Sequence, residues 1–422
     1  MASTTRRRLL VITQYFRPEP NFITADVAES MCRHFDVTLV TAHPNYPRGH
    51  FYEGHRWWYP RRTRENGVTV WRLPMVPYHG RSQLLRAVSY LSFAALATVW
   101  APLVCWRPAI VWVYQTPFTS GLAALWFKWT ASARLIFTSA DLWPESFVAA
   151  GVTRVGALIK LMLAYRRALN RAADAVICST RGTLARYADD GVRPSALHFV
   201  PVWVEGIGDR LEAGSSDGRN HIVYAGNIGP AQSLDTIVRA AEQIEREGLP
   251  VVFDFFGAGS SESELRQLAG QLGLTTFTFH GRKEPREIFE ISSRAFAQIV
   301  SLQPSPLFAM TIPSKVSFCC AAAAPVLYGL PGESATMLAE SSGGIAFDPA
   351  SPASFVAAVK ELLGRPADER QRMRTALREY YDRHLAKPML LARYDQIFLE
   401  TIASPAAKRE ENAYTLDGRR AG

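Results

Sequence analysis

Residues 224–232 have the sequence Tyr224-Ala225-Gly226-Asn227-Ile228-Gly229-Pro230-Ala231-Gln232. They end an apolar run that begins at residue 222, and they lead into a stretch of helical pattern, residues 233–247. A strand that breaks at two glycines before a helix lets the backbone approach a ligand, and the free N–H groups of the helix start favour phosphate oxygens. Glycines at such breaks are also common in plain turns, so this motif alone supports a tight turn and a phosphate site about equally.

A second glycine break occurs in Phe255-Phe256-Gly257-Ala258-Gly259. Here too an apolar run ends at glycines, and the same two interpretations apply. Outward from these motifs, short apolar runs alternate with helical stretches in both halves of the chain, as the buried strands of a parallel sheet do. The expected strands are residues 8–12, 37–41, 110–114, 135–138 and 175–179, then 222–225, 251–256, 277–280, 297–302 and 325–328.

The chain divides at residues 205–220, a stretch rich in glycine, serine and charge that is typical of a linker. A length of 422 residues and a hydrophobic content of 48% suit two folded domains. We therefore predict an α/β protein with two Rossmann-like domains facing across a cleft, residues 1–205 and 206–383. A helix near residues 384–402 is expected to pack back on the first domain, and the polar tail, residues 404–422, is expected to be disordered.

Charge is distributed unevenly between the two halves. Residues 1–205 carry 24 Lys and Arg against 12 Asp and Glu, whereas residues 206–422 carry 23 against 26. The basic first half suggests an anionic partner such as lipid headgroups, lipid diphosphates or nucleic acid. The cysteines are scattered without Cys-x-x-Cys spacing, which predicts neither a disulfide framework nor a zinc site and favours the reducing cytosol: Cys32, Cys105, Cys178, Cys319 and Cys320.

Two segments of the first half bear on membranes. The apolar segment from Leu91 to Trp106 has sixteen residues interrupted by Pro102, fewer than the roughly 20 that cross a bilayer. No transmembrane span is therefore predicted. The cluster from Arg56 to Arg64 combines Trp and Tyr with Arg, the composition of an interfacial anchor. The alternative is a solvated loop, because clusters of charge are usually exposed surface.

A second motif with possible chemistry is Ile312-Pro313-Ser314-Lys315, which precedes a helix-like run. Ser314 is placed to cap that helix, and Lys315 brings a positive charge close to phosphates at the cleft. The alternative is a solvated lysine after a turn.

A third motif, Asp141-Leu142-Trp143-Pro144-Glu145-Ser146, follows the expected strand 135–138. The carboxyl ends of parallel strands border the ligand crevice in doubly wound sheets, so Asp141 and Glu145 are candidates for the cleft. The same spacing also suits a helix N-cap followed by a first-turn glutamate.

Together these motifs resemble a known family. From Gln14-Tyr15-Phe16-Arg17-Pro18-Glu19 and Pro44-Asn45-Tyr46-Pro47-Arg48-Gly49, through residues 141–146, 226–234 and 313–326, the chain resembles the family 4 glycosyltransferases of bacterial capsule, O-antigen and exopolysaccharide synthesis. Within that family it is most similar to a subgroup of colanic acid and N-acetylfucosamine transferases. The resemblance extends to about residue 400, and the joint order of the motifs makes it specific.

The resemblance implies a GT-B fold with acceptor binding in the first domain and nucleotide-sugar binding in the second. It implies a retaining, metal-independent transfer of a hexosyl or N-acetylhexosaminyl group from a UDP-sugar to an undecaprenyl diphosphate-linked saccharide. The expected location is cytoplasmic, peripheral on an anionic inner membrane face, with no nucleic-acid partner and no cofactor. The absence of an Asp-x-Asp metal motif from the sequence agrees with this expectation. The expected catalytic residues are Asp141, Glu145 and Lys315, and the expected donor-binding residues are Gly226, Asn227, Gly229, Gln232, Gly257, Gly259, Arg282, Ser314 and Lys315.

The chain departs from the family at several donor-site positions. Asn227 and Gln232 stand where many members carry Arg and Lys, an exchange common in the subgroup. The family's pair of glutamates falls on Met310 and Phe318, and neither side chain accepts a hydrogen bond from a sugar hydroxyl. These departures leave a second hypothesis, a catalytically impaired homologue that acts as the membrane-associated partner of an active transferase.

Overall fold

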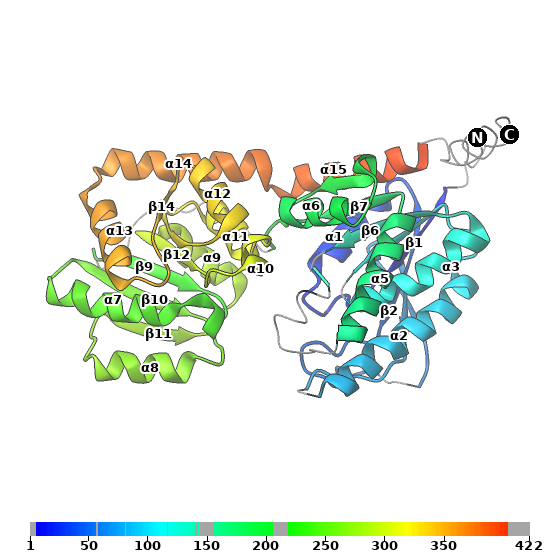
Figure 1. Cartoon of the computed structure of the whole chain (residues 1–422), viewed down its shortest axis with the longest axis horizontal. Helices are drawn as coiled ribbons and strands as arrows, with labels where there is room; N and C mark the ends of the chain where they lie inside the picture. Colours follow the sequence, from blue (N-terminus) through cyan, green and yellow to red (C-terminus); the bar gives the residue numbers. More distant parts are fainter. Residues whose placement is uncertain are drawn as a thin grey trace.

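Two α/β domains stand next to each other in the computed structural model, which describes residues 6–403 except 56–57, 81, 116, 140–141, 144, 146–155 and 206–217 (Figure 1). Asp141, most of the expected linker and the tail, residues 404–422, lie outside the described residues. The first domain is built on an eight-stranded sheet and the second on a six-stranded sheet. This arrangement confirms the predicted pair of Rossmann-like domains.

The sheet of the first domain has the order β3-β4-β2-β1-β5-β6-β7-β8. Every neighbouring pair is parallel except β3 and β4, which are antiparallel. Its central strands are fully buried apolar runs such as Ile110-Val111-Trp112-Val113-Tyr114, because helices cover both faces. The strands are β1 (Arg8–Ile12), β2 (Asp36–Ala42), β3 (Arg61–Glu65), β4 (Val68–Leu73), β5 (Ile110–Tyr114), β6 (Arg134–Ser139), β7 (Ala175–Cys178) and β8 (Leu197–Phe199).

Helices cover the two faces of this sheet unequally. One face packs against α2, α3, α5 and α6, with Phe93, Phe127 and Leu169 in a common core. The other face packs against α1 and the last helix of the chain, α15. The helices are α1 (Phe22–Met31), α2 (Gln83–Val104), α3 (Gly121–Ala131), α5 (Gly156–Ala172) and α6 (Arg181–Asp189), with short 3₁₀ turns at Phe118–Ser120 and Pro194–Ala196.

The sheet of the second domain is entirely parallel and has the order β11-β10-β9-β12-β13-β14. The strand order reverses direction between β9 and β12, which is the switch point where doubly wound sheets bind ligands. The strands are β9 (Asn220–Ala225), β10 (Val251–Phe256), β11 (Phe277–Gly281), β12 (Ala297–Ser301), β13 (Val326–Gly329) and β14 (Gly344–Ala346).

The helices of the second domain also form two layers. Those on one face are α7, α8 and α13, and those on the other include α9, α11, α12 and α14. Their bounds are α7 (Leu234–Arg246), α8 (Glu262–Gln271), α9 (Pro285–Arg294), α10 (Pro306–Ala309), α11 (Ser314–Ala322), α12 (Gly332–Glu340), α13 (Pro352–Gly364) and α14 (Ala367–His384), with a 3₁₀ turn at Pro230–Gln232.

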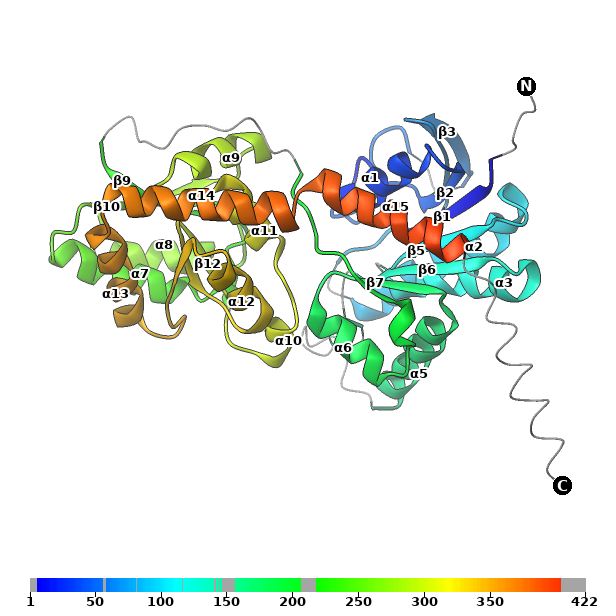
Figure 2. The same ribbon diagram turned by 90° about the horizontal axis from the view of Figure 1, so that it is seen from above.

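The last helix, α15 (Lys387–Ala403), returns to the first domain, as Figure 2 shows. Its buried side chains Tyr394 and Phe398 pack against Trp112 of β5, with ring centroids 6.2 and 5.6 Å apart. Lys387 also forms an ion pair with Asp26 of α1 at 2.8 Å. The chain therefore crosses between the domains twice.

Two sequence interpretations of the first domain need correction. The apolar helix α2 has 22 residues, because it begins at Gln83 instead of Leu91, with Ser82 as its N-cap. By length and composition alone α2 is long and apolar enough to cross a membrane, a test that buried core helices also pass. Within the expected anchor cluster, Arg61–Glu65 is β3, an edge strand whose charged side chains suit an exposed sheet margin.

Candidate active site

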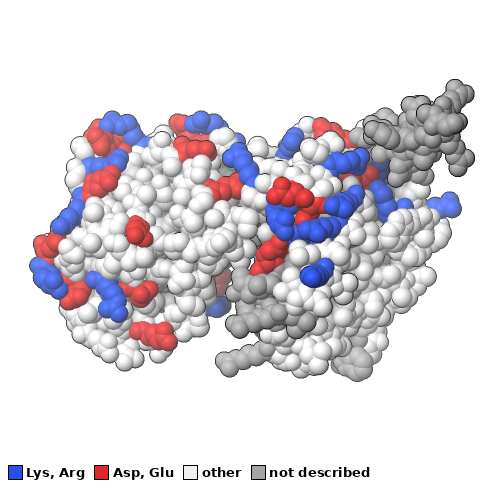
Figure 3. All heavy atoms as spheres, viewed as in Figure 1, with Lys and Arg blue, Asp and Glu red and all other residues white. Residues whose placement is uncertain are grey.

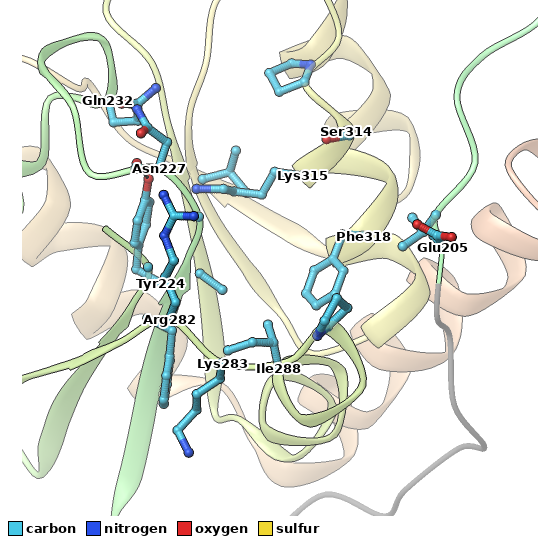
Figure 4. A pocket seen from close by; sticks show the side chains of 18 of the residues that line it. Glu205, Tyr224, Asn227, Gln232, Arg282, Lys283, Ile288, Ser314, Lys315 and Phe318 are labelled. Atoms are coloured by element: carbon cyan, nitrogen blue, oxygen red, sulfur yellow. Dashed lines mark hydrogen bonds between the residues drawn. The ribbon is translucent and has the colours of Figure 1, made fainter. Parts of the chain in front are cut away.

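A cavity of about 620 Å³ opens at the carboxyl ends of β9 and β12, between the two domains. Most of its walls come from the second domain, and Phe22 and residues 203–205 close it from the first domain and the linker. Figure 4 shows part of this lining. The cavity contains seven of the predicted donor-site residues, namely Gly226, Asn227, Gln232, Gly257, Arg282, Ser314 and Lys315.

Lys315 is held at the first turn of α11, where its side chain crosses to the loop after β9. Its Nζ lies 3.6 Å from the ring centroid of Tyr224, a cation–π contact. A Cβ on Gly226 would lie 2.8 Å from that Nζ, so the glycine makes room for the lysine. Gly226 has a φ of 146°, which other residues rarely adopt. The first glycine of the motif thus positions the lysine of the second motif.

Burial lowers the pKa of Lys315 to about 7, because desolvation disfavours the charged ammonium group. Among the described residues, no carboxylate forms an ion pair with it. A cation that is desolvated and lacks a negative partner is stabilised by an anionic ligand. Lys315 is therefore suited to bind phosphate oxygens.

The N-terminus of α11 adds a second anion-binding element. Its N-cap is Pro313, its first residue is Ser314, and its first turn has no acidic side chain. The free N–H groups of that turn favour negative charge. The prediction that Ser314 caps this helix through its side chain is wrong, because no such cap hydrogen bond forms. Ser314 is exposed and lines the cavity.

Asn227 and Gln232 form a small hydrogen-bonded unit in the glycine loop. The Gln232 Oε1 accepts from the Asn227 side-chain amide at 3.3 Å and from the Gly229 N–H at 3.1 Å. The Tyr224 hydroxyl donates to the Asn227 carbonyl oxygen at 2.5 Å. These contacts fix the loop that replaces the family's Arg and Lys with uncharged groups.

The other predicted glycines serve packing as well as access. A Cβ on Gly257 would overlap the carbonyl oxygen of Gly226, and one on Gly259 would overlap that of Ile228. The two glycine loops therefore touch backbone to backbone. Gly257 lines the cavity, as Gly226 does, whereas Gly229 and Gly259 lie outside the lining.

Arg282 is exposed at the cavity mouth, and in Figure 4 its guanidinium group points to the space near Lys315. Neighbouring Lys283 is ion-paired with Glu287 in the first turn of α9. The lining also includes the apolar side chains Phe256, Ile288 and Phe318. A cavity that combines cations with apolar side chains suits a diphosphate joined to a flat base.

Met310 and Phe318, the positions of the family's glutamates, have different surroundings. Phe318 lines the cavity and packs edge-to-face on Phe289. Met310 instead contacts the first domain, where Thr180 donates to its carbonyl oxygen at 2.8 Å. A Cβ on Gly182 would lie 2.9 Å from the Met310 Cα, so the domains touch closely there.

Glu145 does not line the cavity. Its carboxylate forms ion pairs with Arg166 at 2.7 Å and Arg186 at 3.4 Å. Arg166 also pairs with buried Asp190 at 2.5 Å, so Glu145 belongs to a charge network of α5 and α6. Asp141 falls outside the described residues.

No sequence motif marks Glu205, the one carboxylate that lines the cavity among the described residues. It follows buried Trp203, whose indole N–H donates to Asp26 at 2.9 Å and so fixes the start of the linker. Figure 4 places Glu205 on the far side of Phe318 from Lys315. In the parts of the chain that the structure describes, no three acidic, histidine or cysteine side chains gather as a metal site would require.

Two family models match the chain, one for each domain. A glycosyl transferase 4-like domain matches residues 20–203, and a glycosyl transferases group 1 domain matches residues 209–380. A protein of Escherichia coli (strain K12) named as a colanic acid biosynthesis glycosyl transferase, WcaI, is 26% identical over 384 residues, which cover 85% of this chain and 90% of that protein.

Solved structures share the fold at low sequence identity. Sucrose-phosphate synthase from Thermosynechococcus elongatus has a TM-score of 0.71 at 15% identity, covering 95% of this chain and all of that one. The Anabaena protein Alr3699/HepE in complex with UDP and glucose has a TM-score of 0.64 at 12% identity, covering 94% of this chain and all of that one. With two matched domains in this order, the chain belongs to the GT-B glycosyltransferases of family 4.

Proposed function

We propose that the protein transfers a sugar from a UDP-sugar to a lipid-linked saccharide in the synthesis of a cell-surface polysaccharide. The observation that carries the donor part is Lys315, an unpaired and desolvated cation beside the glycine loop and the N-terminus of α11. The UDP bound to Alr3699/HepE supports the choice of base. The name of the Escherichia coli relative supports the place in polysaccharide synthesis.

The proposed chemistry is transfer with retention of configuration and without a metal ion. The bond between the sugar C1 and the diphosphate oxygen breaks, and its electron pair stays on the diphosphate. The acceptor hydroxyl oxygen bonds to C1 on the same face and releases its proton to the departing diphosphate. Lys315 and Arg282 would stabilise the negative charge that develops there, as preorganised donors do in other enzymes.

Nucleotide binding tests the donor site directly. Isothermal titration with UDP, GDP and ADP should show preferred binding of UDP, and Lys315→Ala should weaken it by about 1.5–3 kcal/mol, the value of a hydrogen bond to a charged group. Lys360→Ala is the matched control, because Lys360 is a surface lysine paired with Glu247 outside the cavity. Equal affinity of the two variants for UDP would remove Lys315 from the donor site.

A catalytically impaired homologue is the second candidate, and Met310 favours it. Met310 stands at the family's first glutamate position. It contacts the first domain and does not line the cavity. An impaired homologue should bind UDP but release no UDP from any UDP-sugar in the presence of lipid-linked acceptors. A coupled assay for UDP release with UDP-hexoses and UDP-N-acetylhexosamines distinguishes the two candidates.

A further inference from the structure

The outer surface of α2 is apolar along its whole length. Ten of its positions are exposed, and all except Gln83 carry apolar side chains. Leu84, Val99 and Leu103 are 74%, 65% and 72% exposed. Helices that face water normally present polar side chains on that side. The outer surface of α2 therefore has the composition of a surface that contacts an apolar partner.

This surface continues onto two neighbouring helices. Trp129 of α3 is 75% exposed, Leu161 of α5 is 67% exposed, and α3 packs against both α2 and α5. Figure 3 shows a wide area without charged side chains over the lower part of this domain. We call the exposed apolar side chains of α2, α3 and α5, together with Trp106, the apolar face. It holds twelve of the eighteen exposed large hydrophobic side chains of the described residues.

The inner surface of α2 belongs to the domain core. Phe93, Ala97 and Ala101 are completely buried, in one cluster with Phe127 of α3. The helix cannot leave the domain to span a bilayer without exposing this core. The position of α2 instead suits a helix that lies parallel to a membrane surface, with one side packed in the protein core and the other side facing away from the protein.

The charge carried by the segments that form the apolar face is basic only. Residues 68–140 contain no Asp or Glu, and α5 contains none either. Arg107 and Lys160 are exposed beside it. On the side of β3, Arg62 lies over the ring of Trp71. The ring centroids of Trp71 and Trp100 of α2 are 6.3 Å apart. Basic side chains thus border an apolar surface that ends in two exposed tryptophans, Trp106 and Trp129.

We propose that the apolar face is the surface on which the protein lies on an anionic lipid bilayer. Tryptophan favours the headgroup level and arginine pairs with lipid phosphate, so both the apolar centre and the basic border match such a partner. Contact between two copies through this face would bring like charges together. The choice of partner rests on the proposed lipid-linked acceptor.

The position of α2 connects this surface to the acceptor side of the cleft. Tyr90 of α2 forms a hydrogen bond with Tyr15, which follows the carboxyl end of β1. Exposed Leu84 and Val88 lie in the preceding turns of the same helix. An acceptor whose lipid remains in the bilayer would then enter along α2 toward the carboxyl ends of the strands.

Vesicle sedimentation with the full chain tests this proposal. The wild-type protein should sediment with vesicles of phosphatidylglycerol and phosphatidylethanolamine, and less with phosphatidylcholine or in high salt. The variant Leu91→Ser/Val99→Ser/Leu103→Ser should lower the partition coefficient at least about tenfold, because each buried CH₂ contributes to membrane affinity. Met389→Ser/Leu399→Ser is the control, since these exposed apolar side chains lie on α15.

Several outcomes would overturn the proposal. One is wild-type protein that stays in the supernatant with anionic vesicles at low salt. Another is an equal loss of vesicle binding in the triple variant and in its control. A third is a wild-type protein that is a dimer in analytical ultracentrifugation while the triple variant is a monomer. UDP titration on the same samples separates this inference from the donor site. A triple variant that binds UDP normally yet leaves the vesicles supports the membrane surface alone, and wild-type protein that binds vesicles but no UDP contradicts the donor site alone.

Discussion

The two domains have the same central strand order, but their helices expose different side chains. Every one of the eighteen exposed large hydrophobic side chains lies in the first domain or on α15, and none lies in residues 218–386. The helices of the second domain and the residues next to their ends instead carry eight ion pairs at i,i+4 spacing, such as Arg246–Glu242 and Arg383–Glu379. Such pairs are typical of helices that face water.

The contrast separates two requirements of one reaction. The second domain provides most of the cations and glycines of the proposed donor cavity, and none of the exposed large hydrophobic side chains of the described residues lies in residues 218–386. The first domain carries the basic excess of the chain and the apolar face, the two features that suit the proposed lipid-linked acceptor. Two domains with the same fold can thus have different outer surfaces, one suited to water and one suited to lipid. The packing of the sheet core constrains only the inward side of each helix.

The largest expected effect on stability concerns the buried ion pairs of the first domain. Arg166 is buried between Glu145 and Asp190, so Arg166→Met leaves a buried carboxylate without its closest partner. We expect the free energy of unfolding to fall by about 3–5 kcal/mol. Urea denaturation followed by circular dichroism measures it, with Arg383→Met of the exposed pair in α14 as the control, expected within about 0.5 kcal/mol. Similar values for both variants would mean that the two domains use charge alike.

The second prediction concerns pH and the donor cavity. The pKa of Lys315 is lowered to about 7 in the free protein, and a bound diphosphate raises it again. Binding therefore takes up a proton above pH 7, so the Kd for a UDP-sugar, whose diphosphate keeps its charge in this range, should be constant below pH 7 and rise up to about tenfold per unit above it. Titration calorimetry between pH 6 and 9 checks this. Lys315→Arg should abolish the slope, because arginine stays charged; a slope that persists in this variant would assign the proton elsewhere.

The alternation of apolar runs was enough to predict most strands of both sheets. The run Arg8–Ile12 is β1 as expected, and Ile110–Tyr114 is β5, because buried parallel strands leave continuous apolar sequence. Edge strands lack that signal. In β3 the sequence Arg61-Arg62-Thr63-Arg64-Glu65 has exposed or half-buried side chains throughout, so its pairing with β4 is set by the neighbouring strand and not by its own pattern.

The residues of the candidate site could be predicted only where glycine or charge marked them. Gly226 and Lys315 were identified separately, but their mutual contact depends on how α11 approaches β9, which spacing along the chain does not specify. Glu145 follows β6 as expected, but its carboxylate pairs with Arg166 and Arg186 and does not line the cavity. Glu205 had no recognisable motif, because its role depends on the path of the chain between the domains.

A third, smaller effect is expected at Glu205. Glu205 is the one carboxylate among the described cavity residues. In the proposed site it can accept a hydrogen bond from a hydroxyl of the nucleotide sugar, which the Phe318 side chain cannot do. Glu205→Ala should raise the Kd for UDP or a UDP-sugar by roughly tenfold, the loss of one charge-assisted hydrogen bond. The effect should leave the pH slope intact, because Lys315 keeps its environment. Unchanged affinity for UDP and for UDP-sugars alike would remove Glu205 from the site.

The smallest expected effect is at Val99, in the middle of the apolar face. In a monomer in water its side chain is already solvated, so Val99→Ser should change the free energy of unfolding by no more than about 0.5 kcal/mol. Ala97→Ser, two residues earlier on the buried side of α2, places a hydroxyl among apolar side chains and should cost more, about 1–3 kcal/mol. Thermal unfolding at two protein concentrations measures both. If Val99→Ser destabilised the protein as much as Ala97→Ser, and did so in a concentration-dependent way, Val99 would already be covered by a second copy in solution, and the difference between the two domain surfaces would reflect assembly instead of contact with lipid.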